Sequence, residues 1–314
     1  MDVTVARFRW RVGVFVSAGI FAWSAGPALA RWRLVGENTA SIAYNQGVAF
    51  DAARGKLYFD GVSSTTNSGV YRTDARLRPE VANTSVIPTT SEGYNHAGDL
   101  SFDPMRRRIL LPLECYYPAS GGNTCGVGAI GVVDPVTLRF RYYVNLSRRQ
   151  ITKAMWDEIE PDGRWIWTSS GTHLLIYRSA DITATTARRQ RSGERAGIVG
   201  VDLGSVLPSG AVTGATFYRA AGAGTTQLLL SLNLGATFEV VSIRIRTSCP
   251  KHPKLLSHAA VIIRVPASSL NHEPEGLATT TNVRHHQLVS LLQWQILPAL
   301  SSSTLFSRIL TYSP

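Results

Sequence analysis

The stretch QGVAFDAARGKLYFDG (residues 46–61) reads as one short strand, a turn and a second strand. Apolar residues alternate with small or polar ones in both halves, which is the period of two of a half-buried β-strand. The segment between the halves, DAARG from Asp51, carries the residues that favour a tight turn. The stretch therefore predicts a β-hairpin.

The same pattern recurs along the rest of the chain. Four further copies are GDLSFDPMRRRILLPL (98–113), DEIEPDGRWIWTSSG (157–171), TGATFYRAAGAGTTQLLLSL (213–232) and EGLATTTNVRHHQLVSLLQWQI (275–296). Each copy continues into a third strand, for example VYRTDA from Val70. The period is about 50–65 residues, slightly long for a propeller blade. The repeat predicts a radial array of small sheets.

Such a unit cannot bury both of its faces alone, so the copies are expected to share cores around an axis. The sequence predicts an all-β propeller of five blades. ARWRLVGE (30–37) is a strand without a unit, and the last unit ends at its third strand. We therefore expect the N-terminal strand to close the last blade. GIVGVDLGSV (197–206) is compatible with the remains of a sixth blade, so six blades are an alternative. A β-sandwich is the other alternative, and the long period disfavours it.

Residues 1–30 are typical of a secretory signal peptide. Three arginines precede an apolar run from Val12 to Trp23, and Ala28-Leu29-Ala30 follows Gly26-Pro27. The apolar run is shorter than the ~20 residues of a spanning helix, although an uncleaved anchor remains an alternative. We predict cleavage after Ala30, a secreted or periplasmic protein, no membrane span after cleavage, and a single propeller domain at 31–314.

The cysteines fit an oxidising compartment. Cys115 and Cys125 bracket the polar, glycine-rich stretch CYYPASGGNTC, which predicts a disulfide that closes a hairpin tip. Cys249 has no evident partner, and its role stays open.

Removing residues 1–30, with three arginines and one aspartate, lowers the formal net charge from +11 to +9. The basic runs are Arg106–Arg108 and the polar segment 183–195, which is expected to be a loop, as is 246–259. No aromatic residues are interleaved with them, so the sequence favours solvated faces and no nucleic-acid partner. The expected partner is an extracellular ligand or polymer, and the expected state is a monomer.

Acidic and amide residues fall just before several inner strands of the predicted propeller. Because those strands line one channel, we expect Asn45, Asp99, Asp157 and Glu275 to meet at its mouth. A hard cation such as Ca²⁺ accepts six to eight oxygen ligands, which makes these four the predicted metal ligands. The alternative is structural, because carboxylates at strand entries often accept main-chain N–H bonds in turns. That structural role is the prediction for Asp51, Asp103 and Asp162.

A proton carrier could also act at the predicted mouth. His96 and His272 lie at strand entries, and Glu158 follows Asp157. Imidazole titrates near neutral pH, and a buried carboxyl acquires a raised pKa, so these three are the candidate catalytic residues. The chain has no GxSxG, HExxH, phosphate-loop or dinucleotide motif, which leaves a serine triad without support.

The step Glu275-Gly276-Leu277 at the start of the last unit resembles that of secreted propellers related to gluconolactonases and esterase-like phytases. The resemblance implies a divalent metal in the channel that polarises an ester or lactone. Of the chain's residues, Glu275 and more weakly Asp99 and Asp157 match such ligands. Five units instead of six depart from the family.

Two functions therefore remain open for this chain. One is a secreted binding or scaffold module whose acidic mouth holds a divalent cation or a polar ligand. The other is a metal-dependent hydrolase of esters, lactones or phosphoesters. Fold alone does not choose between them, because propellers host both kinds of function.

Overall fold

A computed structural model describes residues 32–64, 67–88, 93–117, 122–123, 125–219, 225–234, 237–247, 251–266, 272–281, 287–297 and 304–314. The chain divides into two units, Met1–Ala30 and Arg31–Pro314. The predicted signal peptide and Cys249 lie outside the described residues, so both stay predictions.

The described part of the second unit is almost entirely antiparallel β-structure, arranged as five sheets of four or five strands and one small hairpin. The first sheet contains β2 (Gly47–Asp51), β3 (Lys56–Ser64), β4 (Asn67–Asp74) and β5 (Pro79–Asn83). The second contains β6 (His96–Ala97), β7 (Ser101–Asp103), β8 (Arg108–Glu114), β11 (Ala129–Val133) and β12 (Phe140–Asn145). The third contains β13 (Glu158–Ile159), β14 (Trp165–Ser170), β15 (His173–Arg178) and β16 (Val201–Ser205).

The fourth sheet contains β17 (Ala211–Tyr218), β18 (Thr226–Asn233), β19 (Thr237–Arg246), β20 (Lys254–Leu255) and β21 (Ala260–Pro266). The last sheet joins β22 (His272–Thr281), β23 (Gln287–Leu297) and β24 (Thr304–Ser313) to β1 (Arg33–Ala40). Strands β9 (Tyr116–Tyr117) and β10 (Gly122–Asn123) form the hairpin. A 3-10 turn, η2 (Ser179–Asp181), precedes the helix α1 (Ala184–Arg191). No described helix is long and apolar enough to cross a membrane.

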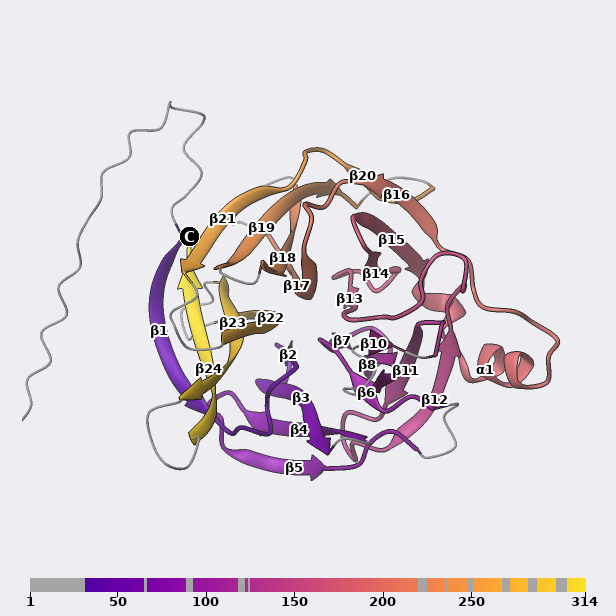
Figure 1. Cartoon of the computed structure of the whole chain (residues 1–314), viewed down its shortest axis with the longest axis horizontal. Helices are drawn as coiled ribbons and strands as arrows, with labels where there is room; N and C mark the ends of the chain where they lie inside the picture. The colour runs from indigo at the N-terminus through magenta and orange to yellow at the C-terminus, as the bar shows by residue number, and fades with distance from the viewer. Residues whose placement is uncertain are drawn as a thin grey trace, which may run out of the picture. The chain divides into compact units, whose positions relative to one another are not determined.

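The sheets of this unit are arranged around an axis (Figure 1). Their inner strands follow one another in a closed cycle, in which β2 contacts β7, β7 contacts β13, β13 contacts β17, β17 contacts β22, and β22 contacts β2 again. This arrangement is that of a β-propeller, and it confirms the predicted all-β propeller class.

Apolar side chains fill the space between each pair of neighbouring sheets. The period of two sends successive residues of one strand to opposite neighbours. In β3, Tyr58 packs toward the second sheet, whereas Leu57 and Phe59 pack toward the last sheet. In the third sheet, Trp165 and Trp167 pack toward the fourth, as expected from their alternate positions. Among the described residues, a cluster of buried apolar side chains therefore lies between each pair of neighbouring sheets.

The last sheet contains strands from both ends of the unit. Strand β1 pairs antiparallel with β24, from Arg33 opposite Ser313 to Ala40 opposite Ser307. The strand order β1-β24-β23-β22 makes β1 the outermost strand. This pairing confirms the prediction that the N-terminal strand closes the last sheet.

Several local predictions are corrected. Residues 201–205 do not begin a further sheet but form β16, the outer strand of the third. The segment 183–195 contains α1 rather than only a loop, because the Thr183 hydroxyl accepts the Thr186 N–H and caps the helix. Part of 246–259 pairs with β19 as β20. Arg108 is buried, so it does not belong to a solvated face.

Two other predictions are confirmed. Cys115 and Cys125 form a disulfide. The turn carboxylates Asp51, Asp103 and Asp162 each accept a main-chain N–H two residues further on, as an Asx turn requires.

Deleting residues 31–40 tests the role of β1 in ring closure. The deletion exposes the edge of β24 and removes an inter-sheet contact. We therefore expect the free energy of unfolding to fall by several kcal/mol, and Tm to fall by about 2–4 °C for each kcal/mol lost. Thermal denaturation followed by circular dichroism measures the change.

The matched control is the double substitution Leu34→Ser, Val35→Ser, because these side chains are 52% and 56% exposed. Its Tm is expected to stay within ~2 °C of the parent chain. An equal Tm for the deletion and the parent chain would show that β1 does not hold the ring closed.

Candidate functional site

Asp99 lies between β6 and β7 and joins all five sheets at the axis. Its Oδ1 accepts the main-chain N–H of Val48 at 3.0 Å, and its Oδ2 accepts those of Ala215 and Leu277 at 2.9 and 3.3 Å. These donors belong to the first, fourth and last sheets. The main chain of Asp99 bonds to Met155 O and Asp157 N, at the entry to the third sheet. Asp99 is fully buried.

Three glycines allow the inner strands to approach Asp99. A Cβ on Gly214 would lie 2.7 Å from Asp99 Oδ2, and one on Gly276 would lie 2.8 Å from Asp99 Oδ1. A Cβ on Gly47 would lie 2.7 Å from the Cα of Asp99. Real side chains do not come this close, so only glycine fits at the three positions. Backbone atoms and Asp99 therefore fill the axis at this level.

In two of the four predicted metal ligands the side-chain oxygens accept main-chain N–H groups, and the metal site itself stays a prediction. The oxygens of Asp99 face three N–H donors, whose positive ends repel a cation. The Asn45 amide has two main-chain partners, since its Oδ1 accepts Val62 N–H at 2.8 Å and its Nδ2 donates to Ile42 O at 3.0 Å. Glu275 is buried. The described residues contain no group of three or more His, Cys, Asp or Glu side chains that could hold a metal ion.

Asp157 is the predicted ligand that lies beside Asp99. It is fully buried, its Oδ2 accepts the Ser101 hydroxyl at 2.6 Å, and its Oδ1 has no hydrogen-bond partner among the described residues. Burial raises the pKa of Asp157 to about 7, although Ser101 and Arg108 oppose the shift. Burial and the charge of Asp157 also raise the pKa of the buried Asp60 well above its usual range. Both carboxyls therefore ionise less readily than an exposed aspartate.

The candidate histidines belong to the side on which the inner strands begin. His96 Nδ1 lies 2.8 Å from Glu114 Oε1, without the alignment of a hydrogen bond, and its ring lies 5.4 Å from that of Tyr116. Glu114 is buried and Tyr116 is exposed. His272 begins β22, but its side chain lies outside the described residues. The prediction that either histidine transfers a proton stays a prediction.

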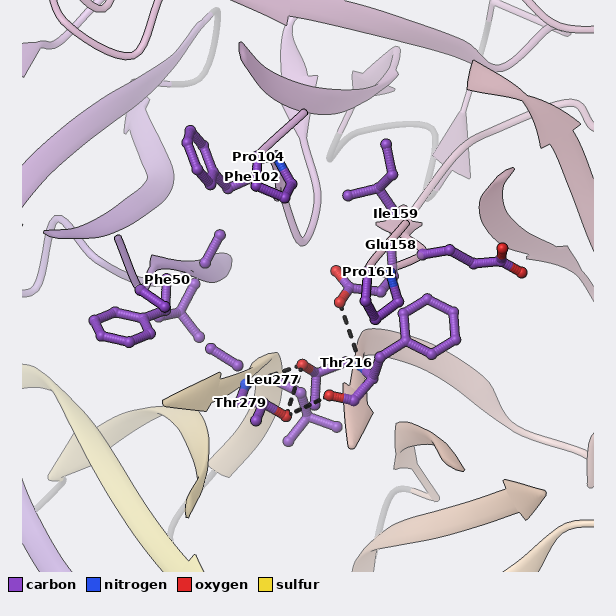
Figure 2. Close-up of a pocket in the computed structure, with 15 residues that line it drawn as sticks. Phe50, Phe102, Pro104, Glu158, Ile159, Pro161, Thr216, Leu277 and Thr279 are labelled. Carbon is purple, nitrogen blue, oxygen red and sulfur yellow. Dashed lines mark hydrogen bonds between the residues drawn. The ribbon is translucent and has the colours of Figure 1, made fainter. Parts of the chain in front are cut away.

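A pocket of about 220 Å³ opens toward the other end of the inner strands (Figure 2). Every sheet contributes to it, because its lining comes from the last residues of β2, β7 and β13 and from the second halves of β17 and β22. The lining residues are Val48, Ala49, Phe50, Ala52, Phe102, Pro104, Glu158, Ile159, Glu160, Pro161, Thr216, Phe217, Leu277, Ala278 and Thr279. Most of these residues are apolar, and Glu158, Glu160, Thr216 and Thr279 are the polar ones.

Glu158 is the candidate residue that this pocket contains. Its Oε1 accepts the Phe217 N–H at 3.2 Å, so its carboxyl lies against β17 among the lining residues (Figure 2). Burial and the charge of Asp157 raise the pKa of Glu158 well above its usual range. A protonated carboxyl both donates and accepts a hydrogen bond. Glu158 therefore brings to the pocket a carboxyl that ionises less readily than an exposed glutamate.

Two threonines form the polar border beside Glu158. Thr216 Oγ1 accepts the Thr279 N–H at 2.9 Å, and Thr279 Oγ1 donates to Phe217 O at 2.7 Å. These bonds tie β17 to β22 across the sheet boundary and fix both hydroxyls at the pocket wall (Figure 2). The threonine oxygens keep lone pairs that a ligand donor could use.

Glu160 is a pocket residue that sequence reasoning missed. It is fully buried, its Oε1 accepts the indole N–H of Trp167 at 3.0 Å, and its Oε2 has no partner among the described residues. Burial raises its pKa to about 8. The available signal was the alternation Glu158-Ile159-Glu160, which puts two acids on the same face of an inner strand.

No family model and no curated protein matches the sequence. A GH43 endo-arabinanase from Bacillus licheniformis is similar in structure, with a TM-score of 0.50, 14% identity, and coverage of 87% of this chain and 95% of that one. An endo-arabinase from Bacteroides thetaiotaomicron VPI-5482 has a TM-score of 0.49 at 11% identity, covering 87% and 96% of the two chains. A Myxococcus xanthus glutaminyl cyclase has a TM-score of 0.46 at 11% identity, covering 90% and 95%.

At these identities the comparison with the endo-arabinanase supports the fold alone. Together with the closed cycle of inner strands, it defines the chain as an all-β protein of propeller arrangement. It assigns no activity to the pocket.

Replacing Asp99 by asparagine tests its role at the axis. The new NH₂ group meets main-chain N–H donors in place of an acceptor oxygen, so at least one buried donor loses its partner. We expect a loss of about 2–4 kcal/mol in the free energy of unfolding, measured by urea denaturation.

Asp162→Asn is the control for that substitution, because Asp162 is a partly exposed turn carboxylate. It is expected to change stability by less than ~1 kcal/mol. Equal effects of the two substitutions would contradict the central role of Asp99.

The raised pKa of Asp157 predicts how stability depends on pH. Its pKa is about 7 in the folded protein and 3.8 in the unfolded chain, so the folded state binds more protons between these values. The contribution of Asp157 to the free energy of unfolding is complete below pH 3.8. It is lost as the pH rises to about 7, and the free energy of unfolding falls by up to ~1.4 kcal/mol for each pH unit.

Asp157→Asn removes this titration while keeping an oxygen for Ser101. Urea denaturation between pH 4 and 8 should show the difference between variant and parent shifting in favour of the variant as the pH rises. A difference that is constant with pH would rule out a raised pKa at Asp157.

Proposed function

We propose that this protein is a ligand-binding β-propeller whose axial pocket holds a small ring-shaped molecule with a hydrogen-bond acceptor. In this proposal each of the five sheets is one blade, and β1 completes the fifth. The proposal rests on one observation, which is that residues of every sheet, most of them apolar, line a pocket that also contains the carboxyl of Glu158.

The chemistry of the lining defines the ligand class. Eleven of the fifteen lining residues are apolar, which favours a ligand with an apolar or ring-shaped body. The neutral carboxyl of Glu158 can donate to a carbonyl or ether oxygen. A cationic ligand is disfavoured, because the carboxyl supplies no charge to compensate it.

The size of the pocket limits the ligand. Its volume of about 220 Å³ is below the ~300 Å³ at which sites for drug-sized ligands begin. One ring fits, whereas a polymer chain running across the axis does not. The pocket is thus suited to a small molecule or to the end of a chain.

A second candidate function is hydrolysis with Glu158 as a general acid. A raised carboxyl pKa and a position in a pocket favour this role. Glycoside hydrolysis, the activity class named for the similar endo-arabinanase, also needs a second carboxylate as base or nucleophile. The other acid of the lining, Glu160, has a pKa of about 8 and is protonated at neutral pH as well. Binding is therefore the stronger proposal.

The sequence adds a location to this proposal. The predicted signal peptide and the disulfide Cys115–Cys125 both fit a secreted or periplasmic protein. The proposal requires no metal ion, and Glu158 needs none in order to donate its hydrogen bond.

The variants Glu158→Gln and Glu158→Leu separate the two functions. The probe is δ-valerolactone, a ring with a carbonyl acceptor, with binding followed by saturation-transfer NMR and ring opening by pH-stat. Glutamine keeps a donor, so we expect binding within about threefold of the parent chain, whereas leucine weakens binding by roughly tenfold. A general-acid role instead predicts measurable turnover by the parent chain that falls by ~10²-fold or more in the glutamine variant.

The pH dependence gives an independent readout. The parent chain is expected to bind the lactone at low pH and to lose affinity as the pH rises through the raised pKa of Glu158, because the ionised carboxyl no longer donates. The glutamine variant should bind equally across that range. Glu194→Gln, at an exposed carboxylate, is the control and should behave like the parent chain. Equal affinity of the leucine and glutamine variants would refute the proposed donor.

A further inference from the structure

A second, separate surface lies around α1 on the outer side of the second and third sheets (Figure 1). Six arginines there belong to two short segments, residues 148–149 and residues 188–195. Five of them, called the arginine face below, are Arg148, Arg149, Arg188, Arg191 and Arg195. All are exposed except Arg195, which is half-buried.

Side-chain clamps hold the two segments together. Gln190 Oε1 accepts the main-chain N–H of Asn145 at 2.8 Å, and its Nε2 donates to Asn145 O at 3.0 Å. Gln150 makes the same pair of bonds with Gly200, at 2.8 and 2.9 Å. Leu146 and Ile198 also form a parallel bridge. Arg148 and Arg149 are therefore fixed beside the segment that carries the other three arginines.

The charge of this surface is almost uncompensated. Among the described residues, no member of the arginine face forms an ion pair, and the sixth arginine, Arg189, pairs with Glu194 at 3.4 Å. Elsewhere arginines serve the fold, as Arg72 does by donating to Pro135 O at 2.9 Å and Val136 O at 3.0 Å. Five like charges on two joined segments repel one another, and a bound anion relieves this repulsion.

We propose that the arginine face binds an acidic polysaccharide. A guanidinium group donates two parallel hydrogen bonds to a carboxylate, and several fixed guanidinium groups match a polymer that repeats its carboxylates. The helix carries alanine and threonine in its apolar positions and no large side chain that could enter a bilayer. Within described residues 184–195 no aromatic ring is available to stack on a base.

The double variants Arg148→Gln, Arg149→Gln and Arg188→Gln, Arg191→Gln test the arginine face in the full chain. The probe is polygalacturonate, with binding measured by calorimetry at several salt concentrations. We expect the parent chain to bind more weakly as salt increases, and each double variant to lose roughly tenfold or more in affinity at low salt.

Arg76→Gln, Arg139→Gln is the matched control, because it removes two exposed arginines on other parts of the fold. It should change affinity by less than about twofold. Vesicles with anionic lipid and a duplex DNA of equal charge are the competing probes. Tighter binding of either one, no binding of polygalacturonate, or an equal loss in the control would overturn the proposal. The pocket variant Glu158→Leu should leave polygalacturonate binding unchanged.

Discussion

The propeller depends on the carboxylate of Asp99, which accepts main-chain N–H groups from three different inner strands. Where inner strands converge on an axis, their N–H groups point into a space that excludes water. A buried donor without a partner costs about 1–3 kcal/mol, so a central acceptor is required. Asp99 provides two oxygens on a short side chain, and its main chain bonds to the sheet that its side chain does not reach. Glycines at 47, 214 and 276 give it room, which couples the identity of one acid to three small residues far apart in the sequence.

Outside the axis, arginine side chains join neighbouring sheets through hydrogen bonds. Arg108 is buried, bonds to Asp103 at 3.0 Å and donates to the carbonyls of Ser179 and Ile182, in the segment that follows β15 of the third sheet. Arg72 makes the corresponding contact from the first sheet to the second. Part of the basic composition is therefore structural, and charge alone was a poor guide to partners. What distinguishes the arginine face is that its guanidinium groups have no such structural duty.

Much of the fold could be predicted from the sequence because the repeat, the turn residues and the alternation of apolar residues are local signals. The same signals placed β1 beside β24 and Asp51, Asp103 and Asp162 in turns. The site was harder to predict. Asp99 looks like a ligand in sequence, but its donors are 51, 116 and 178 residues away, and only the fold shows that they are N–H groups. Glu160 gave little signal because its raised pKa comes from burial. The helix α1 was missed because its only start signal was the Thr183 cap.

The carboxyls that close the ring also determine the chemistry of the pocket. Glu158 follows Asp157 in the chain, and the charge of Asp157 contributes to the raised pKa of Glu158. The charge of Glu158 in turn contributes to the raised pKa of Asp99. Protonation at the axis and protonation in the pocket are consequently linked, since ionising one of these acids makes it harder to ionise its neighbours. A neutral pocket acid suits binding of an acceptor ligand. A hydrolase would also need an ionised carboxylate beside the ligand, and the other acid of the lining, Glu160, has a raised pKa as well.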